Sequence, residues 1–456
     1  MVLFACGIVA FAFANVGFTL KGQHASTIVG YMVVFMAIVF GAHLAVRRWA
    51  PYADPLLLPI ATLLNGLGLV MIYRLNQAGR AGNASASGSP ISTLGSSATV
   101  TQIFYTVVGV IVFVVFIALI KDIRILQPYT YVFGLVGLGL IALPALLPSR
   151  ISGVADTSAK IQVSIGGFSV QPEEFGKMLL AASFASYLVI NGRKLSLLTE
   201  KWWIFSLPRR RDLAPIIGVW ALSMLVLIFE GDIGTSAVFM GLFVAMLYIA
   251  TGRRSWAILG FLMFIIGAIA AATLVSHVGQ RFSVWLHPFS TANLIDPPQL
   301  SYQTVQGLYG MGNGGLLGKG LGNGQPFWTP LVQSDLIFTS FGEELGLTGV
   351  MALLLLYGLF VQRGLRTAML VKDDYSKLLA SGLSFMFALQ VFVIVGGVTN
   401  LIPLTGITTP FLSQGGSSLI ASWLLVAVIA RLSDAARRPA PKPIQDEGMT
   451  QVVSLR

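Results

Sequence analysis

Residues 281–346 read RFSVWLHPFSTANLIDPPQLSYQTVQGLYGMGNGGLLGKGLGNGQPFWTPLVQSDLIFTSFGEELG and form the longest polar, glycine-rich interval between two apolar segments of the chain. The interval carries Asp335, Glu343 and Glu344 into the start of a hydrophobic run that continues to about Leu359. Ionisable side chains at membrane depth are rare and costly, so each of them is a candidate functional group. Asp335, where loop becomes helix, is the first candidate for chemistry. For Glu343 and Glu344, a functional role and a structural role are equally consistent with the sequence. In the structural role they neutralise basic partners and hold helices together.

The composition indicates an integral membrane protein. Of the 456 residues, 55% are hydrophobic and only 10% are charged, whereas a soluble domain carries about a quarter charged residues. The net charge of +11 comes from short basic clusters between apolar runs, which is typical of cytoplasmic loops and argues against a nucleic-acid partner. The single cysteine and the four histidines, which show no ligand spacing, argue against a disulfide framework and a zinc site.

The apolar runs predict an all-α, polytopic fold with twelve helices that cross about 30 Å of hydrocarbon. Lys and Arg concentrate in alternate connections, which places both termini in the cytoplasm and the 276–335 loop outside. Residues 74–100 are predicted to be a flexible external linker, and the tail 433–456 is predicted to be disordered. The expected helices lie near 2–20, 28–46, 55–73, 101–120, 129–147, 174–191, 213–230, 233–251, 256–276, 336–361, 378–400 and 412–432.

Two short motifs interrupt the hydrophobic pattern at the outer ends of helices. QPEEFGK at 171–177 places Glu174 and Lys177 three residues apart on one helix face, either as an intrahelical ion pair or as groups that face a substrate. EGDIGT at 230–235 forms a tight outer turn and puts Asp232 at a helix start, where it would orient a cation or Arg281.

A third motif, PFLSQGGSS at 410–418, precedes the last hydrophobic run. Its glycines let the backbone come close to a ligand, and amides at the start of a helix suit an anion. A single glycine-rich turn is weak evidence by itself, so its value lies in its combination with the other motifs.

Taken in order, these motifs resemble the SEDS proteins, the RodA/FtsW/SpoVE glycosyltransferases that polymerise peptidoglycan from lipid II. The resemblance rests on QPEEFGK, EGDIGT, YQTVQGLYGMGNGGLLGKGLG, SDLIF with GEELG, and PLTGITTPFLSQGGSS. It covers residues 52–432 and implies a ten-helix body with a large extracellular loop, which makes 1–51 two additional N-terminal transmembrane helices. The RodA-like form of high-GC Gram-positive bacteria has such an addition. The chain departs from the usual pattern at Glu173, where the family has serine, and at Leu331, where it has an acid.

The resemblance also implies a reaction and its partners. A sugar hydroxyl of the acceptor attacks the anomeric carbon of the lipid II donor, the nascent glycan grows, and undecaprenyl diphosphate leaves. The site is the outer face of the cytoplasmic membrane, and the expected partner is a class B penicillin-binding protein, the transpeptidase that crosslinks the new strand.

The residues expected to carry this reaction follow from the matched motifs. Asp335 is the catalytic candidate, either as the base for the hydroxyl or as the ligand of a divalent cation, Mg²⁺ or Mn²⁺. Glu343 lies about 80° around the helix from Asp335 and is expected to share its cavity. Substrate and diphosphate binding is expected from Lys177, Arg281, Lys319, Gln303, Ser413, Gly415, Gly416 and Ser417, and the supporting acids are Glu174, Asp232, Glu343 and Glu344.

Two other functions fit a polytopic chain with buried charges. One is a transporter or lipid II flippase, and the other is a scaffold that recruits the penicillin-binding protein without catalysis. The outward placement of every motif favours catalysis at the surface. Among elongation, division and sporulation, the RodA-like start of the body and the two extra helices favour elongation.

Overall fold

The structure, a computed structural model, describes residues 1–19, 25–85, 98–147, 163–165, 168–197, 199–202, 205–208, 218, 221–222, 232–296 and 299–439. Within this part of the chain, eleven helices are long and apolar enough to cross a membrane, which confirms an all-helical, polytopic membrane protein. The expected span at 213–230 lies almost entirely outside the described residues. The long helices are α1 (Val2–Thr19), α2 (Ala25–Trp49), α3 (Leu57–Ser85), α4 (Ala98–Leu119), α5 (Thr130–Leu146, preceded by the 3-10 helix η1, Ile123–Tyr129), α7 (Glu173–Leu197), α9 (Ile233–Thr251), α10 (Arg254–Leu274), α14 (Ile337–Leu370), α15 (Asp374–Val398) and α16 (Gly416–Arg437).

Helices α3, α15 and α16 form the centre of the bundle, because most of their residues are buried, whereas α1, α2, α5 and α10 expose apolar side chains at its periphery. Trp423 on α16 packs edge to face on Phe113 of α4 and on Phe411, with ring centroids 5.6 and 5.9 Å apart. Such aromatic pairs add stability beyond the area they bury. They fix the loop before α16 to the core.

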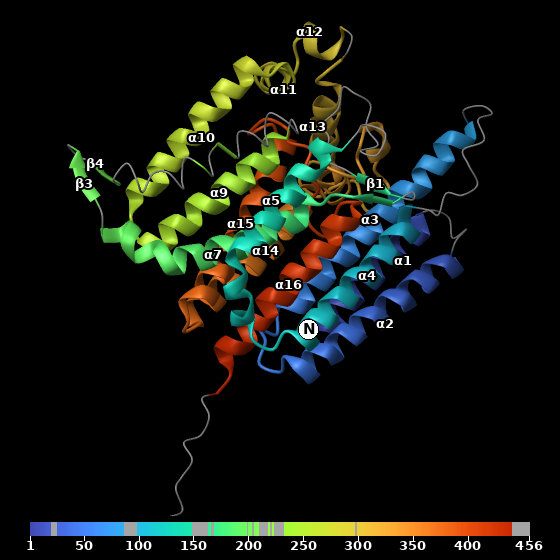
Figure 1. Cartoon of the computed structure of the whole chain (residues 1–456). Coiled ribbons are helices and arrows are strands. Elements are labelled where there is room, and N and C mark those ends of the chain that lie inside the picture. The colour runs from blue at the N-terminus through green and yellow to red at the C-terminus, as the bar shows by residue number, and fades with distance from the viewer. Residues whose placement is uncertain are drawn as a thin grey trace, which may run out of the picture.

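The predicted 276–335 loop contains regular structure and lies at the end of the bundle away from the C-terminal end of α16 (Figure 1). It contains α11 (Ser276–Leu286), α12 (Thr291–Leu294), α13 (Tyr302–Gly314) and the short 3-10 helix η2 (Pro326–Trp328). These helices escaped prediction because they are short and polar. Residues 74–85 are likewise not a linker, since α3 continues to Ser85, and residues 86–97 lie outside the described part.

Two antiparallel hairpins accompany the helices. β1 (Val163–Ile165) pairs with β2 (Phe168–Val170), and β3 (Thr199–Trp202) pairs with β4 (Phe205–Pro208). Strands of three and four residues are too short to show a period of two in the sequence. In the tail, α16 continues to Arg437, so residues 433–437 are helical, and residues 440–456 lie outside the described part.

The glycine-rich segment at 310–324 has a composition that is typical of a flexible loop, but it is packed against α14. Backbone amides of Lys319 and Gly320 donate to the carbonyls of Glu343 and Glu344, over 3.0 and 2.9 Å. At the kink of α14, Gly346 has φ 66° and ψ −171°. The glycines therefore serve close backbone approach, a use that composition alone cannot distinguish from flexibility.

Replacing Gly346 by alanine is expected to destabilise the protein by about 1–3 kcal/mol, because a Cβ there requires a backbone conformation open mainly to glycine. The new Cβ would also lie 2.3 Å from the amide nitrogen of Gly318. Thermal unfolding in detergent measures the loss. Gly358→Ala on the same helix is the control, since a Cβ at that position meets nothing within 4 Å. Equal melting temperatures for the two variants would contradict the prediction.

Candidate active site

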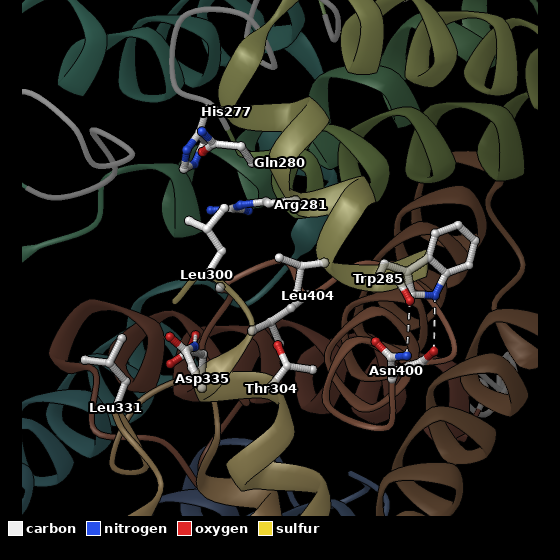
Figure 2. A pocket seen from close by; sticks show the side chains of 13 residues that line it. His277, Gln280, Arg281, Trp285, Leu300, Thr304, Leu331, Asp335, Asn400 and Leu404 are labelled. Carbon is white, nitrogen blue, oxygen red and sulfur yellow. Dashed lines mark hydrogen bonds between the residues drawn. The ribbon is translucent and has the colours of Figure 1, made fainter. Parts of the chain in front are cut away.

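A cavity of about 280 Å³ opens beside Asp335 at the end of the bundle that carries α11–α13. Figure 2 shows His277 and Arg281, both from α11, on one side of it and Asp335 and Thr304 on the other. The lining residues are His277, Gln280, Arg281, Val284, Trp285, Leu300, Gln303, Thr304, Leu331, Asp335, Asn400, Leu404 and Gly406. The cavity therefore combines one carboxylate, one guanidinium and several neutral polar groups.

Asp335 lies two residues before α14 and is 8% exposed. Its Oδ1 accepts a hydrogen bond from Ser334 Oγ (2.9 Å), and its Oδ2 accepts one from Gln303 Nε2 (3.4 Å). Burial raises the pKa of the Asp335 carboxyl above its ordinary value, and the hydrogen bond from Ser334 and the charge of Arg281 oppose part of that rise. A carboxyl group whose pKa is raised in this way is, when ionised, a stronger base than a solvated aspartate.

Arg281 donates from Nη1 to the carbonyl oxygen of Thr405 over 3.0 Å, which fixes the guanidinium at the cavity wall. A guanidinium has five N–H donors, so one internal bond leaves donors for an anion. His277, one helical turn earlier, has a buried Nε2 without a hydrogen-bond partner in the described part of the chain. Burial and the nearby charge of Arg281 lower the pKa of His277, which keeps its imidazole neutral at pH 7.

The remaining cavity wall is held by Trp285 and Asn400. Trp285 Nε1 donates to the carbonyl oxygen of Asn400 (3.1 Å), and Asn400 Nδ2 donates to the carbonyl oxygen of Trp285 (3.3 Å). Of the residues that line the cavity, Asp335, Arg281 and Gln303 were predicted from the sequence, whereas His277, Gln280 and Asn400 were not. Asn400 has a positive φ of 58°, and no pattern in the sequence predicts this backbone conformation. His277 and Gln280 could have been found from their spacing to Arg281, which places all three residues on one helix. They were missed because this segment was predicted to be a loop.

The loop before α16 supports the segment that carries Asp335. Ser413 Oγ accepts from the amide of Thr409 (2.8 Å) and donates to the carbonyl oxygen of Ser334. The amide of Gln414 donates to the carbonyl oxygen of Gln333 over 2.8 Å. The backbone just before Asp335 is therefore held by Ser413 and Gln414.

The other predicted residues of this loop also face the protein. Ser417 Oγ accepts from the amide of Gln171 (2.8 Å), and a Cβ at Gly416 would lie 2.3 Å from the ring of Tyr105. Ser413, Gly415, Gly416 and Ser417 do not line the cavity, whereas Gly406 of the same loop does.

A second group of charges lies between α7 and α9. Lys177 Nζ donates to Glu174 Oε1 over 3.0 Å, so the predicted ion pair is confirmed, and Lys177 is 0% exposed. Asp232 caps α9, because its Oδ1 accepts from the amides of Gly234 and Thr235. The Thr235 hydroxyl lies 2.7 Å from Asp232 Oδ2 and 3.0 Å from Glu173 Oε2. None of these residues lines the cavity. Asp232, which was expected to orient a cation or Arg281, contacts Gly234 and Thr235, and Arg281 contacts Thr405.

A third group, at the kink of α14, does not reach the cavity either. Glu343 Oε1 accepts from the amide of Gln325 (2.8 Å) and from Asn313 Nδ2 (3.4 Å), so the structure does not place it beside Asp335. Glu344 Oε1 lies 3.2 Å from Arg74 Nε in an ion pair whose side chains are both buried. Lys319 is exposed, and among the described residues it contacts this group through its backbone amide.

The fold and this cavity define a polytopic membrane protein with a buried carboxylate facing an arginine at one end of its helices. The sequence profile of the FtsW/RodA/SpoVE family, described as "Cell cycle protein", matches residues 54–438, and the chain belongs to this family. Helices α1 and α2 precede the matched part.

The relatives include "Peptidoglycan glycosyltransferase RodA" of Mycobacterium tuberculosis, 45% identical over 413 residues, which cover 90% of this chain and 84% of the relative. "Stage V sporulation protein E" of Bacillus subtilis is 32% identical over 287 residues, 62% of this chain and 74% of the relative.

Solved structures share the fold. Rod shape determining protein RodA of Thermus thermophilus has a TM-score of 0.56 at 20% identity, covering 85% of this chain and 98% of that one. A chain from a peptidoglycan synthase complex has a TM-score of 0.54 at 21% identity, covering 89% of this chain and 96% of that one.

Proposed function

We propose that this chain is a peptidoglycan glycosyltransferase that polymerises lipid II into glycan strands on the outer face of the cytoplasmic membrane. The observation that carries the proposal is 45% identity across 90% of the chain to proteins of that activity. The cavity with Asp335 opposite Arg281 adds support from the structure. The RodA names of the 45% identical relatives favour a role in elongation over division or sporulation.

The reaction needs a base for the attacking hydroxyl and positive charge for the departing diphosphate. Asp335 supplies a buried carboxylate with two hydrogen-bonded oxygens, and it removes the hydroxyl proton as the hydroxyl attacks the anomeric carbon. Arg281, fixed by Thr405, supplies the planar donors that match phosphate oxygens. Neutral groups beside them, His277 and Gln303, suit sugar hydroxyls and amides.

A divalent cation, Mg²⁺ or Mn²⁺, fits this site only with most of its ligands taken from water and substrate. In the described part of the chain, no group of three His, Cys, Asp or Glu side chains is arranged to hold a metal. Mg²⁺ commonly binds through one or two carboxylates plus substrate phosphates, and Asp335 is the carboxylate available here. When bound, the cation would neutralise charge on the diphosphate. A ligand role for Asp335 predicts that higher Mg²⁺ lowers the pH at which activity is lost, since the metal competes with the proton.

The orientation with both termini cytoplasmic is part of the proposal. At the end of the bundle away from the cavity, Asp54 contacts Arg437 and Arg363, and Asp434 contacts Arg431 and Arg438. Basic residues concentrated at one end are typical of the cytoplasmic side. The cavity then opens at the outer surface, where lipid II is used and where a class B penicillin-binding protein acts.

The pH profile of polymerisation is expected to show an acid limb with a pKa above the ordinary aspartate value of 3.8, because burial raises the pKa of Asp335. The carboxylate accepts a proton only when ionised, so activity is present above this pKa and lost as the pH falls through it. His277→Gln is the control, because the pKa of His277 is lowered from its ordinary value and this imidazole is the other cavity group that could titrate in the acid range. The limb is expected to persist in this variant. An acid limb that disappears in His277→Gln would contradict the assignment to Asp335.

The deciding experiment measures glycan strands made from labelled lipid II by the purified protein, alone and with its penicillin-binding protein. The proposal expects strands from the wild type. Transport of lipid II in vesicles without any strands would support the flippase. Neither activity, with retained binding of the penicillin-binding protein, would support the scaffold.

A further inference from the structure

Helix α1 lies outside the family-matched residues yet packs closely along α3. The two backbones approach at Gly66 of α3, where a Cβ would lie 2.3 Å from Val9. Further along, the ring of Phe13 lies 5.9 Å from that of Tyr73. Val9, Phe13 and Val16 are buried in one cluster with residues of α2 and α3. α1 is therefore packed along α3 as part of the fold, and its contacts reach Tyr73, the residue before Arg74.

The last residue of α1 contacts the glycine-rich segment. Thr19 Oγ1 lies 3.2 Å from the carbonyl oxygen of Leu321 and 2.9 Å from that of Asn15, so its proton is shared between them. Gly322 has φ 91°, and a Cβ there would lie 2.8 Å from the Cβ of Thr19. Leu321 packs against the same apolar cluster that holds α1. The position of residues 321 and 322, at the start of the segment 321–325, is thus set in part by α1.

The opposite side of this segment is held by a buried ion pair. Arg74 Nη2 donates to the carbonyl oxygens of Gly322 (2.8 Å) and Gly324 (2.9 Å). Its Nε lies 3.2 Å from Glu344 Oε1, and Glu344 Oε2 accepts from the amide of Gly322 over 2.9 Å. With Gln325 bonded to Glu343, the segment is fixed to α3 and α14 as well. η2 follows at once and leads to Asp335.

We propose that α1 is a built-in brace for the active-site loop. Its outer end, together with the Arg74–Glu344 pair, fixes residues 321–325 and thereby orients the chain that carries Asp335. Thr19, Arg74 and Glu344 are positioning residues, since they act through the segment and contact no cavity atom. The inference rests on the proposed glycosyltransferase function and assigns a role to a helix that the family match leaves out.

The test introduces a bulky side chain at the contact between Thr19 and Gly322 and leaves the Arg74–Glu344 ion pair unchanged. Thr19→Trp forces the bulk of an indole against Gly322, whereas Phe18→Trp puts the same side chain one position earlier, where Phe18 is 84% exposed. For Thr19→Trp we expect kcat for lipid II polymerisation to fall on the order of 10²-fold with little change in KM, because small displacements of catalytic groups cost that much. Phe18→Trp is expected to match the wild type.

A second readout does not depend on activity. Hydrogen–deuterium exchange of residues 321–335 is expected to quicken in Thr19→Trp and in the milder Arg74→Lys, which keeps the charge but loses the paired bonds to Gly322 and Gly324. If Thr19→Trp does not fold, Arg74→Lys and the exchange measurement carry the test. Unchanged exchange and unchanged kcat in a folded variant would overturn the brace. A wild type that makes no strands in the same assay, with quickened exchange in the variants, would instead overturn the proposed function and leave the brace supported.

Discussion

Asp335→Asn is expected to reduce lipid II polymerisation by about 10²–10⁴-fold, the share of a rate that a positioned base supplies. The amide keeps the shape of the side chain; its oxygen can accept from Gln303, and its NH2 group can donate to the Ser334 hydroxyl in place of the bond that Ser334 donates to the carboxylate. It cannot take a proton from the acceptor hydroxyl or carry the negative charge that a cation needs. The measurement is the rate of strand formation from labelled lipid II at equal amounts of folded protein.

Asp296→Asn is the matched control, because Asp296 is an exposed acid in the segment between α12 and α13, at the same end of the bundle. It removes one negative charge from that region without touching the cavity, so its rate is expected to equal that of the wild type. Comparable rates for Asp335→Asn and the wild type would place the chemistry at another group. Equal losses in both variants would point to a general effect of negative charge at this surface and not to a base.

Helices were predicted well from the sequence where an apolar run is long enough to cross a bilayer. They were predicted poorly where tertiary packing determines whether a segment is helical. Asp335 and Arg281 were predicted as site residues, and both line one cavity in the structure, while their roles stay predictions. Arg74 was treated as part of an external linker because it follows an apolar run, but α3 continues through it and Glu344 binds it in the interior. A buried partner some 270 positions away in the chain is invisible to local patterns.

The glycine-rich motifs show the same limit of local patterns. The GGSS turn was predicted to approach a ligand, and this stays a prediction; in the structure a Cβ at Gly416 would meet the ring of Tyr105, and a Cβ at Gly314 or Gly318 would meet the backbone of α14. A missing Cβ permits contact with a ligand or with another part of the chain, and only the three-dimensional arrangement distinguishes these uses. The loop before α16 contacts the backbone that precedes Asp335 through Ser413, and among the predicted binding residues Arg281 and Gln303 line the cavity.

The predicted binding role of Lys177 meets a different constraint, since its ammonium is buried against Glu174 and outside the cavity. Glu174 contacts this ammonium directly, and the buried carboxyl groups of Glu173 and Asp232, both within hydrogen-bond distance of Thr235, are near enough to interact with it electrostatically. Removing one partner of a buried ion pair leaves an uncompensated charge, which costs much more than the pair itself contributes. Measuring the free energy of unfolding after Lys177 is replaced therefore distinguishes a structural lysine from a substrate-binding one.

Lys177→Met is expected to lower the free energy of unfolding by about 3–5 kcal/mol, because Glu174 then stays buried without its cation. Adding Glu174→Gln to the same chain is expected to recover a large part of the loss, since no unpaired charge remains in that pair. Unfolding in detergent measures both, and exposed Lys121→Met, expected to change stability by less than about 0.5 kcal/mol, is the control. Full stability of Lys177→Met with loss of polymerisation would return Lys177 to the substrate, and α7 would then have to move to bring it there.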